Sequence, residues 1–285
     1  MAPRHDPVST LWAEYDPRRP RETVEALRQE WLRAAPRPVK NIKASQQQLQ
    51  QTVGIPVPVL KALGQSLAKQ VKSVEHALPL AKALWVEGGR EGRVVAVQPL
   101  GRLGVLAPAK LVSELRALCA TCLTWEDADL FAMYALEPLV LKQPEAHLAT
   151  LRAWTDDESP WVRRAAVTVA GRLAMKKRGA LVPECLRLVE RLLGDDALDV
   201  KRATSFALRL AARGDLDAVA KFLDTHVPPR DAAATWVLCD AIRSMSKAFL
   251  PKLRFLAPRY RRWAAADVSA TERRSIEAAA KLLER

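Results

Sequence analysis

The chain has 285 residues, of which 49% are hydrophobic and 27% are charged. This balance predicts a compact fold and excludes a chain that is disordered throughout. The formal net charge of +13 favours a polyanion such as nucleic acid as the partner, because neutralised phosphates release counterions. The alternative is a soluble protein whose many arginines reflect a GC-rich genome.

Four cysteines, Cys119, Cys122, Cys185 and Cys239, do not suggest a disulfide framework in a chain of this size. Residues 1–10 lack the apolar core of a signal peptide. No apolar run approaches the roughly 18 residues that a membrane-spanning helix needs. We therefore expect a cytoplasmic protein that has no membrane partner.

The first half of the chain predicts helices interrupted by prolines and glycines. Residues 1–20 are rich in proline and arginine, and we expect a disordered tail there. Residues 23–35 predict a first helix, residues 54–58 mark a break and restart, and residues 74–103 predict two more helices. Runs typical of strands are almost absent, and alanine, leucine and arginine favour helix. Residues 21–285 therefore predict a single all-α domain.

The second half contains a repeat of 38 residues. The segment Val-Arg-Arg-Ala at 162–165 matches Val-Lys-Arg-Ala at 200–203, and weaker echoes fall beside Trp125 and at Leu238. Each repeat contains a short acidic turn, a helix with apolar periodicity and a second helix. This pattern predicts a HEAT-like helical-repeat solenoid, an α-α superhelix with an extended concave surface.

Basic residues recur in register with this repeat. Equivalent helices would place them on one face together with Trp125, so the sequence predicts a basic concave face that binds DNA phosphates. For any one of these side chains, the alternative is a solvated charge without a ligand. The candidate DNA-binding residues are Arg163, Arg164, Lys201, Arg202, Arg209, Arg243 and Lys247, with further basic runs at 176–178 and 259–263.

Trp125 and Asp129, in the stretch TWEDADLFAMY, would share one face of a helix. A carboxylate on a basic surface repels DNA unless it has a function. One interpretation is that Asp129 stabilises the positive charge on a sugar whose glycosidic bond breaks, while the Trp125 indole faces a cationic base or sugar. The alternative is that Trp125 packs in the core and Asp129 forms a salt bridge, for instance with Arg164.

Metal, redox and nucleotide-binding sites lack support in the sequence. Cys119 and Cys122 have C-x-x-C spacing, but no second cysteine pair and no histidine lies near them. The chain contains no Ser/His/Asp set, P-loop or glycine-rich dinucleotide motif. We therefore expect buried thiols, no metal and no cofactor.

Five segments together resemble the AlkD-like alkylpurine DNA glycosylases, a family of HEAT-like-repeat proteins. In chain order they read GIPVPVLKAL, ALWVEGGREGRVVAV, LTWEDADLF, SPWVRRAAV and VKRATSFALR, and the resemblance extends over about residues 25–260. It implies a DNA glycosylase of the 3-methyladenine/7-methylguanine type. Such an enzyme hydrolyses the N-glycosidic bond of cationic N3- or N7-alkylated purines in double-stranded DNA, without metal, cofactor or base flipping.

The resemblance also implies roles for individual residues. Trp125 would contact the deoxyribose of the lesion, and Asp129 would stabilise the cationic sugar and position water. Arg164, with Arg163 as its neighbour, would hold a backbone phosphate. Phe206 stands where the family commonly has a second tryptophan and offers a smaller, less electron-rich aromatic face. We therefore expect Asp129, Trp125 and Phe206 to form the catalytic site.

Two departures from the family pattern keep a rival hypothesis open. One is Phe206, and the other is the absence, around residues 43–51, of a tyrosine that some members carry on an N-terminal helix. Both favour a catalytically weak or inactive HEAT-like module that binds structured or damaged DNA. In either case we expect a monomer whose partner is double-stranded DNA.

Overall fold

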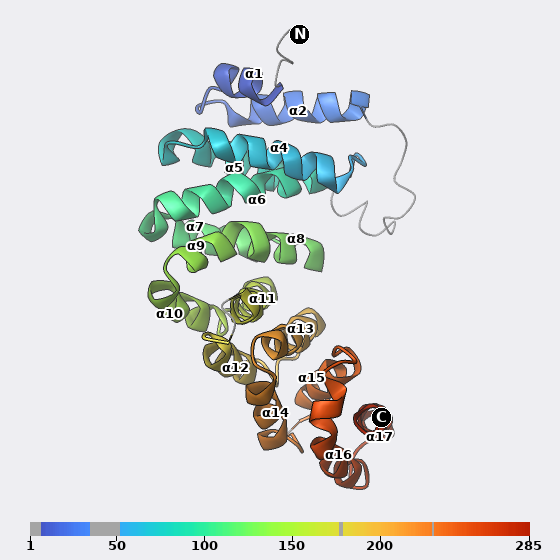
Figure 1. Ribbon diagram of the computed structural model, residues 1–285. Coiled ribbons are helices and arrows are strands. Elements are labelled where there is room, and N and C mark those ends of the chain that lie inside the picture. The colour runs from blue at the N-terminus through green and yellow to red at the C-terminus, as the bar shows by residue number, and fades with distance from the viewer. Residues whose placement is uncertain (1–6, 35–51, 177–178, 230) are drawn as a thin grey trace. The chain divides into compact units, whose positions relative to one another are not determined.

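The structure is a computed structural model that describes residues 7–34, 52–176, 179–229 and 231–285. These residues form helices joined by turns, and no strand occurs among them (Figure 1). The predicted all-α architecture is therefore confirmed. Contacts gather the chain into two compact units, Met1–Pro144 and Glu145–Arg285. The single domain over residues 21–285 stays a prediction.

The described elements of unit 1 are helices of 6 to 18 residues. Proline or a capping side chain stands at several helix starts, as at Pro108 and at Ser73, whose hydroxyl accepts a hydrogen bond from the His76 backbone. The elements are α1 (Pro7–Glu14), α2 (Pro20–Ala34), α4 (Val57–Gln70), α5 (Val74–Glu87), α6 (Gly89–Leu106), α7 (Pro108–Ala120), α8 (Trp125–Leu130), the π-helix η1 (Phe131–Leu136) and α9 (Glu137–Lys142).

The N-terminal segment from residue 7 onward is ordered on unit 1, although the sequence predicted a tail over residues 1–20. The rings of Trp12 and Tyr15 each pack edge-on against His76 of α5, with 5.1 Å between ring centroids. Burial raises the pKa of Tyr15 to about 12. Aromatic packing thus anchors α1, a contact that composition alone does not reveal. Residues 1–6 and the segment 43–51 without the family tyrosine lie outside the described residues.

Unit 2 contains the repeat that the sequence predicted. Its elements are α10 (Pro144–Trp154), α11 (Pro160–Lys176), α12 (Val182–Arg191), α13 (Leu198–Gly214), α14 (Leu216–Thr225), α15 (Ala232–Arg243), the 3-10 helix η2 (Leu250–Leu256), α16 (Ala257–Ala264) and α17 (Ala270–Leu283).

Helices α11 and α13 confirm the shift of 38 residues, because both contain 17 residues and start at Pro160 and Leu198. The two helices pack closely at Gly171, where an added Cβ atom would come within 2.7 Å of the Ala207 Cα. A larger residue at position 171 would push the two repeats apart.

Arginine side chains link one repeat to the next within each unit. Each of these arginines pairs with an aspartate that lies 32 to 35 residues away in sequence. The spacing matches one helix pair, so the ion pairs recur with the architecture. The pairs are Arg93–Asp127, Arg163–Asp195, Arg191–Asp156 and Arg259–Asp224. These arginines are therefore paired with aspartates of the protein itself and are less available to a partner.

Candidate nucleic-acid interface

Trp125 is the first residue of α8, and its side chain is not in the core. The residue is 50% exposed, and Leu123, two residues before it, is 44% exposed. Thr124 caps the helix, because its hydroxyl accepts a hydrogen bond of 3.3 Å from the Asp127 backbone. The exposure of Trp125 thus excludes the alternative that its side chain packs in the core.

Asp129 lies one turn after Trp125 on α8 and is half-buried. The two residues are four apart in a helix, so their side chains share one face, as the sequence predicted. A partly dehydrated carboxylate beside an exposed indole can stabilise a cation more strongly than the same carboxylate in open water.

Helix α8 continues without a break into the π-helix η1. The hydroxyl of Tyr134, on η1, accepts a hydrogen bond of 3.0 Å from the Lys61 ammonium of α4. The Lys61 nitrogen also lies 5.0 Å from the centroid of the Tyr134 ring. Wide π-turns occur frequently at functional sites. The sequence analysis missed both this turn and the Lys61–Tyr134 contact, because neither has a local sequence signal.

Two arginines of α6 hold the start of α8. Arg90 donates two hydrogen bonds to the Glu126 carboxylate, at 3.0 and 2.8 Å. Arg93 donates to Asp127 at 2.7 Å, and the side chains of this pair are only 9% and 2% exposed. Both arginines fall in the segment ALWVEGGREGRVVAV, but no local pattern there marks them as functional residues.

In unit 2, Arg163 uses its guanidinium within the protein. It donates to both Asp195 oxygens, at 2.6 and 3.2 Å, and to the backbone carbonyls of Asp157 and Glu158. Arg164 is 6% exposed and donates to the Asp199 carbonyl. The contacts of Arg163 make it a link between two repeats. Arg164 is nearly buried, so little of its side chain is available to a phosphate.

Helix α13 carries three of the predicted site residues, of which Arg202 and Phe206 are exposed and Arg209 is half-buried. Arg202, Phe206 and Arg209 are spaced by four and three residues, so they lie on one helical face. Phe206 is 38% exposed, and the Arg209 guanidinium lies 5.2 Å from the centroid of its ring. Burial lowers the pKa of Arg209, which leaves it charged at neutral pH. Lys201, beside them, is half-buried.

The remaining predicted basic residues, Arg243 and Lys247, are exposed at the end of α15 and just after it. Arg243 lies 3.5 Å from Asp240 of α15, which also accepts a hydrogen bond of 2.6 Å from Ser205 of α13. Asp240 lies 38 residues after Arg202, so the repeat replaces a basic residue with an acidic one at this position. That substitution is visible in the sequence as Asp240 aligned with Arg202.

The structure therefore groups the predicted site residues within each unit. Trp125 and Asp129 lie on α8 in unit 1, and the exposed aromatic and basic residues of α13 and α15 lie in unit 2.

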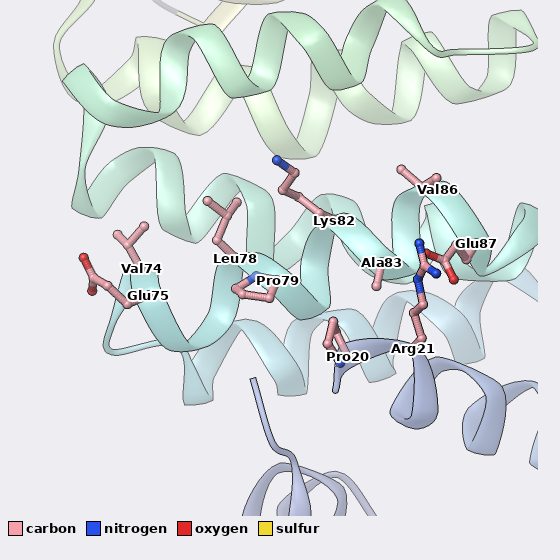
Figure 2. Close-up of a pocket in the computed structure, with 10 residues that line it drawn as sticks. All are labelled: Pro20, Arg21, Val74, Glu75, Leu78, Pro79, Lys82, Ala83, Val86 and Glu87. Atoms are coloured by element: carbon pink, nitrogen blue, oxygen red, sulfur yellow. The ribbon is translucent and has the colours of Figure 1, made fainter. Parts of the chain in front are cut away.

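A pocket of about 590 Å³ in unit 1 contains none of these residues. Apolar side chains of α5 form its floor, and the Arg21–Glu87 ion pair borders one end, as Figure 2 shows. Its lining is Pro20, Arg21, Val74, Glu75, Leu78, Pro79, Lys82, Ala83, Val86 and Glu87. The pocket thus does not coincide with the predicted catalytic residues.

The cysteines are buried thiols, as expected. Burial raises the pKa of Cys122 well above its usual value, and that of Cys185 and Cys239 to about 12. Within the described ranges, no group of three or more His, Cys, Asp or Glu residues has the arrangement of a metal site. The helices described here are also too short or too polar to cross a bilayer.

The helical fold and the paired helices of the 38-residue repeat define a helical-repeat protein. A family model described as DNA alkylation repair enzyme matches residues 31–245. The chain belongs to this family.

Solved structures with a similar fold come from Streptococcus mutans. The crystal structure of smu.31 from strain UA159 has a TM-score of 0.59 and 16% sequence identity, covering 80% of this chain and 100% of that one. The crystal structure of AlkD2 has a TM-score of 0.60 and 16% identity, covering 80% and 99%. No curated protein matches the chain in sequence.

Proposed function

We propose that the protein is a monofunctional DNA glycosylase that hydrolyses the N-glycosidic bond of N3- or N7-alkylated purines in double-stranded DNA. The observation that carries this proposal is the α8 geometry, with a 50% exposed Trp125 on the same helical face as a half-buried Asp129. Membership of the DNA alkylation repair enzyme family supports damaged DNA as the substrate. We further propose that the protein acts as a monomer in the cytoplasm.

The chemistry requires little from the protein beyond positioning and electrostatics. An alkylated purine carries a positive charge, so the base leaves without a strong general acid. Departure creates an oxocarbenium-like sugar, which the Asp129 carboxylate stabilises while it orients the attacking water. The exposed indole face of Trp125 packs on the sugar, where its π-electrons favour the developing positive charge.

The proposed DNA contacts in unit 2 come from the exposed face of α13 and the end of α15. Arg202, Arg243 and Lys247 are exposed and would bind phosphates. Phe206 would offer an aromatic surface, although Arg209 already lies over its ring. Arg164, which is 6% exposed and donates to the Asp199 carbonyl, would offer little of its side chain to a phosphate.

The proposal is tested by measuring free 7-methylguanine released from methylated duplex DNA by the purified protein. We expect release by the parent protein and a loss of about 100-fold or more in the single-turnover rate for Asp129→Asn, which keeps the shape but not the charge. DNA affinity should stay the same or increase slightly, because a negative charge is removed. Equal rates for the two proteins would contradict the role of Asp129.

The rival function, DNA binding without catalysis, has its own signature in the same experiment. A protein of that kind would bind duplex DNA with a steep salt dependence and release no base above the spontaneous rate. The partial cover of Phe206 by Arg209 is the observation that favours it.

A further inference from the structure

We propose that Arg93 of α6, together with Arg90 one turn before it, is a positioning residue that sets the orientation of Trp125 and Asp129. This inference rests on the proposed function and adds to it two residues that touch neither the DNA nor the reacting atoms. It follows from the contacts that join α6 to residues 121–127, where a turn leads into the first residues of α8.

Arg93 binds both ends of the segment 121–127. Its NH1 group donates to the Asp127 carboxylate at 2.7 Å, and its NH2 group donates to the Thr121 carbonyl at 3.2 Å. The guanidinium also lies 4.9 Å from the ring of Trp85, whose indole N–H donates to Thr121 and Leu118. A planar guanidinium bound on three sides fixes direction as well as distance.

Asp127 passes this constraint to the backbone around Trp125. The same carboxylate oxygen that binds Arg93 accepts a hydrogen bond of 3.0 Å from the Leu123 backbone. The Asp127 backbone in turn donates to the Thr124 hydroxyl at 3.3 Å. The two bonds close a small ring of contacts, from which the exposed side chains of Leu123 and Trp125 project.

Arg90 fixes the residue that directly follows Trp125. It is 8% exposed and binds both oxygens of Glu126, at 3.0 and 2.8 Å. Trp125 is therefore flanked on its C-terminal side by two acidic residues, each held by its own arginine. A bidentate pair of this kind restricts rotation of the helix about its axis.

The contacts of Arg90 and Arg93 fall on the first turn of α8, the end that no other helix continues. The opposite end of α8 runs on into η1, so these arginines act at the end where a helix frays and where Trp125 lies. Burying two ion pairs costs desolvation free energy that an apolar contact of the same size would avoid. The presence of arginines here, instead of apolar residues, is explained if they set the orientation of Trp125 and Asp129 and do not only add stability.

The test compares Arg93→Lys and Arg90→Lys with the parent protein. Lysine keeps the charge and the stem but cannot bind Asp127 and Thr121 together. We expect the single-turnover rate of base release to fall by about 10- to 100-fold in Arg93→Lys, because small displacements of reacting groups are costly. DNA affinity should be unchanged, which separates the rate from binding. Circular dichroism and urea unfolding verify that the variants are folded under the assay conditions.

A matched control is Lys82→Gln, which breaks another interhelical ion pair of unit 1, Lys82–Glu114 at 2.7 Å, away from α8. It should leave the rate at the parent value. Hydrogen exchange provides a readout that does not need activity. Amides of residues 121–130 should exchange faster in Arg93→Lys than in the parent, and Lys82→Gln should leave them unchanged.

A double variant shows whether Arg93 acts through Asp129. If it does, adding Arg93→Lys to Asp129→Asn should lower the single-turnover rate little further. If Arg93 acts independently of Asp129, the two fold-losses in rate should multiply. Equal rates for Arg93→Lys and parent, or fully multiplicative losses, would overturn this inference alone. A parent protein that releases no base would instead overturn the proposed function.

Discussion

The guanidinium of Arg163 on α11 forms a two-bond ion pair with the carboxylate of Asp195, which lies just before α13. The side chains are 19% and 6% exposed. Arg163, which the sequence assigned to DNA binding, therefore has a structural role between repeats.

Arg163→Gln should therefore lower stability more than DNA affinity. It removes a nearly buried pair and leaves the Asp195 charge without its main partner, which should cost about 1–3 kcal/mol in the free energy of unfolding. Urea unfolding measures this loss. The salt dependence of DNA binding should match that of the parent, and a clearly shallower slope would return Arg163 to the interface.

Arg202→Gln should have the opposite effect. Its side chain is 55% exposed and lies 3.6 Å from Asp199, a surface ion pair that contributes little to stability. If it binds a phosphate, its loss should reduce the slope of log affinity against log salt by about 0.9. Fluorescence anisotropy between about 50 and 200 mM salt measures the slope. An unchanged slope would show that Arg202 is only a solvated charge.

Phe206→Trp should increase the rate of base release several-fold, because an indole is a better cation–π surface than a phenyl ring. Phe206 is partly exposed, so the larger ring can be accommodated without repacking the core. Phe206→Ala should lower the rate, and Phe255→Ala, which removes an exposed phenylalanine of η2, serves as the control. If Phe206→Ala retains the parent rate, this aromatic position does not take part in the reaction.

Stability should decline with falling pH through the region where histidine titrates. Burial lowers the pKa of His147 on α10, so the folded state binds a proton more weakly than the unfolded chain does. Its contribution to stability is complete above the unfolded pKa of about 6.5 and is lost progressively below it. Urea unfolding at about pH 7.5 and 5.5 should show the decline, and His147→Gln should reduce it. An identical decline in the variant would assign the effect to another group.

Much of the fold was accessible from the sequence because helix periodicity and the repeat are local signals. The match of 162–165 with 200–203 correctly predicted the paired helices α11 and α13. The spacing of Trp125 and Asp129 likewise predicted a shared helical face. The packing of Tyr15 on His76 was not accessible, because it joins residues that are distant in sequence.

The environment of each charged residue was harder to predict. Arg163 and Arg202 are both basic residues of the repeat that the sequence assigned to DNA, yet one is held by Asp195 and the other is largely exposed. The difference depends on which acidic residue the next helix pair brings within reach. The roles of Arg90 and Arg93 depend in the same way on α6 packing beside α8, which no local pattern encodes.

Division of the chain into two compact units has a consequence for how such a protein diversifies. The contacts that Arg90 and Arg93 make with α8 lie within unit 1, while the exposed cations of α13 and α15 belong to unit 2. Substitutions at those exposed cations leave the contacts of Arg90 and Arg93 intact, so the two sets of residues can change separately in evolution.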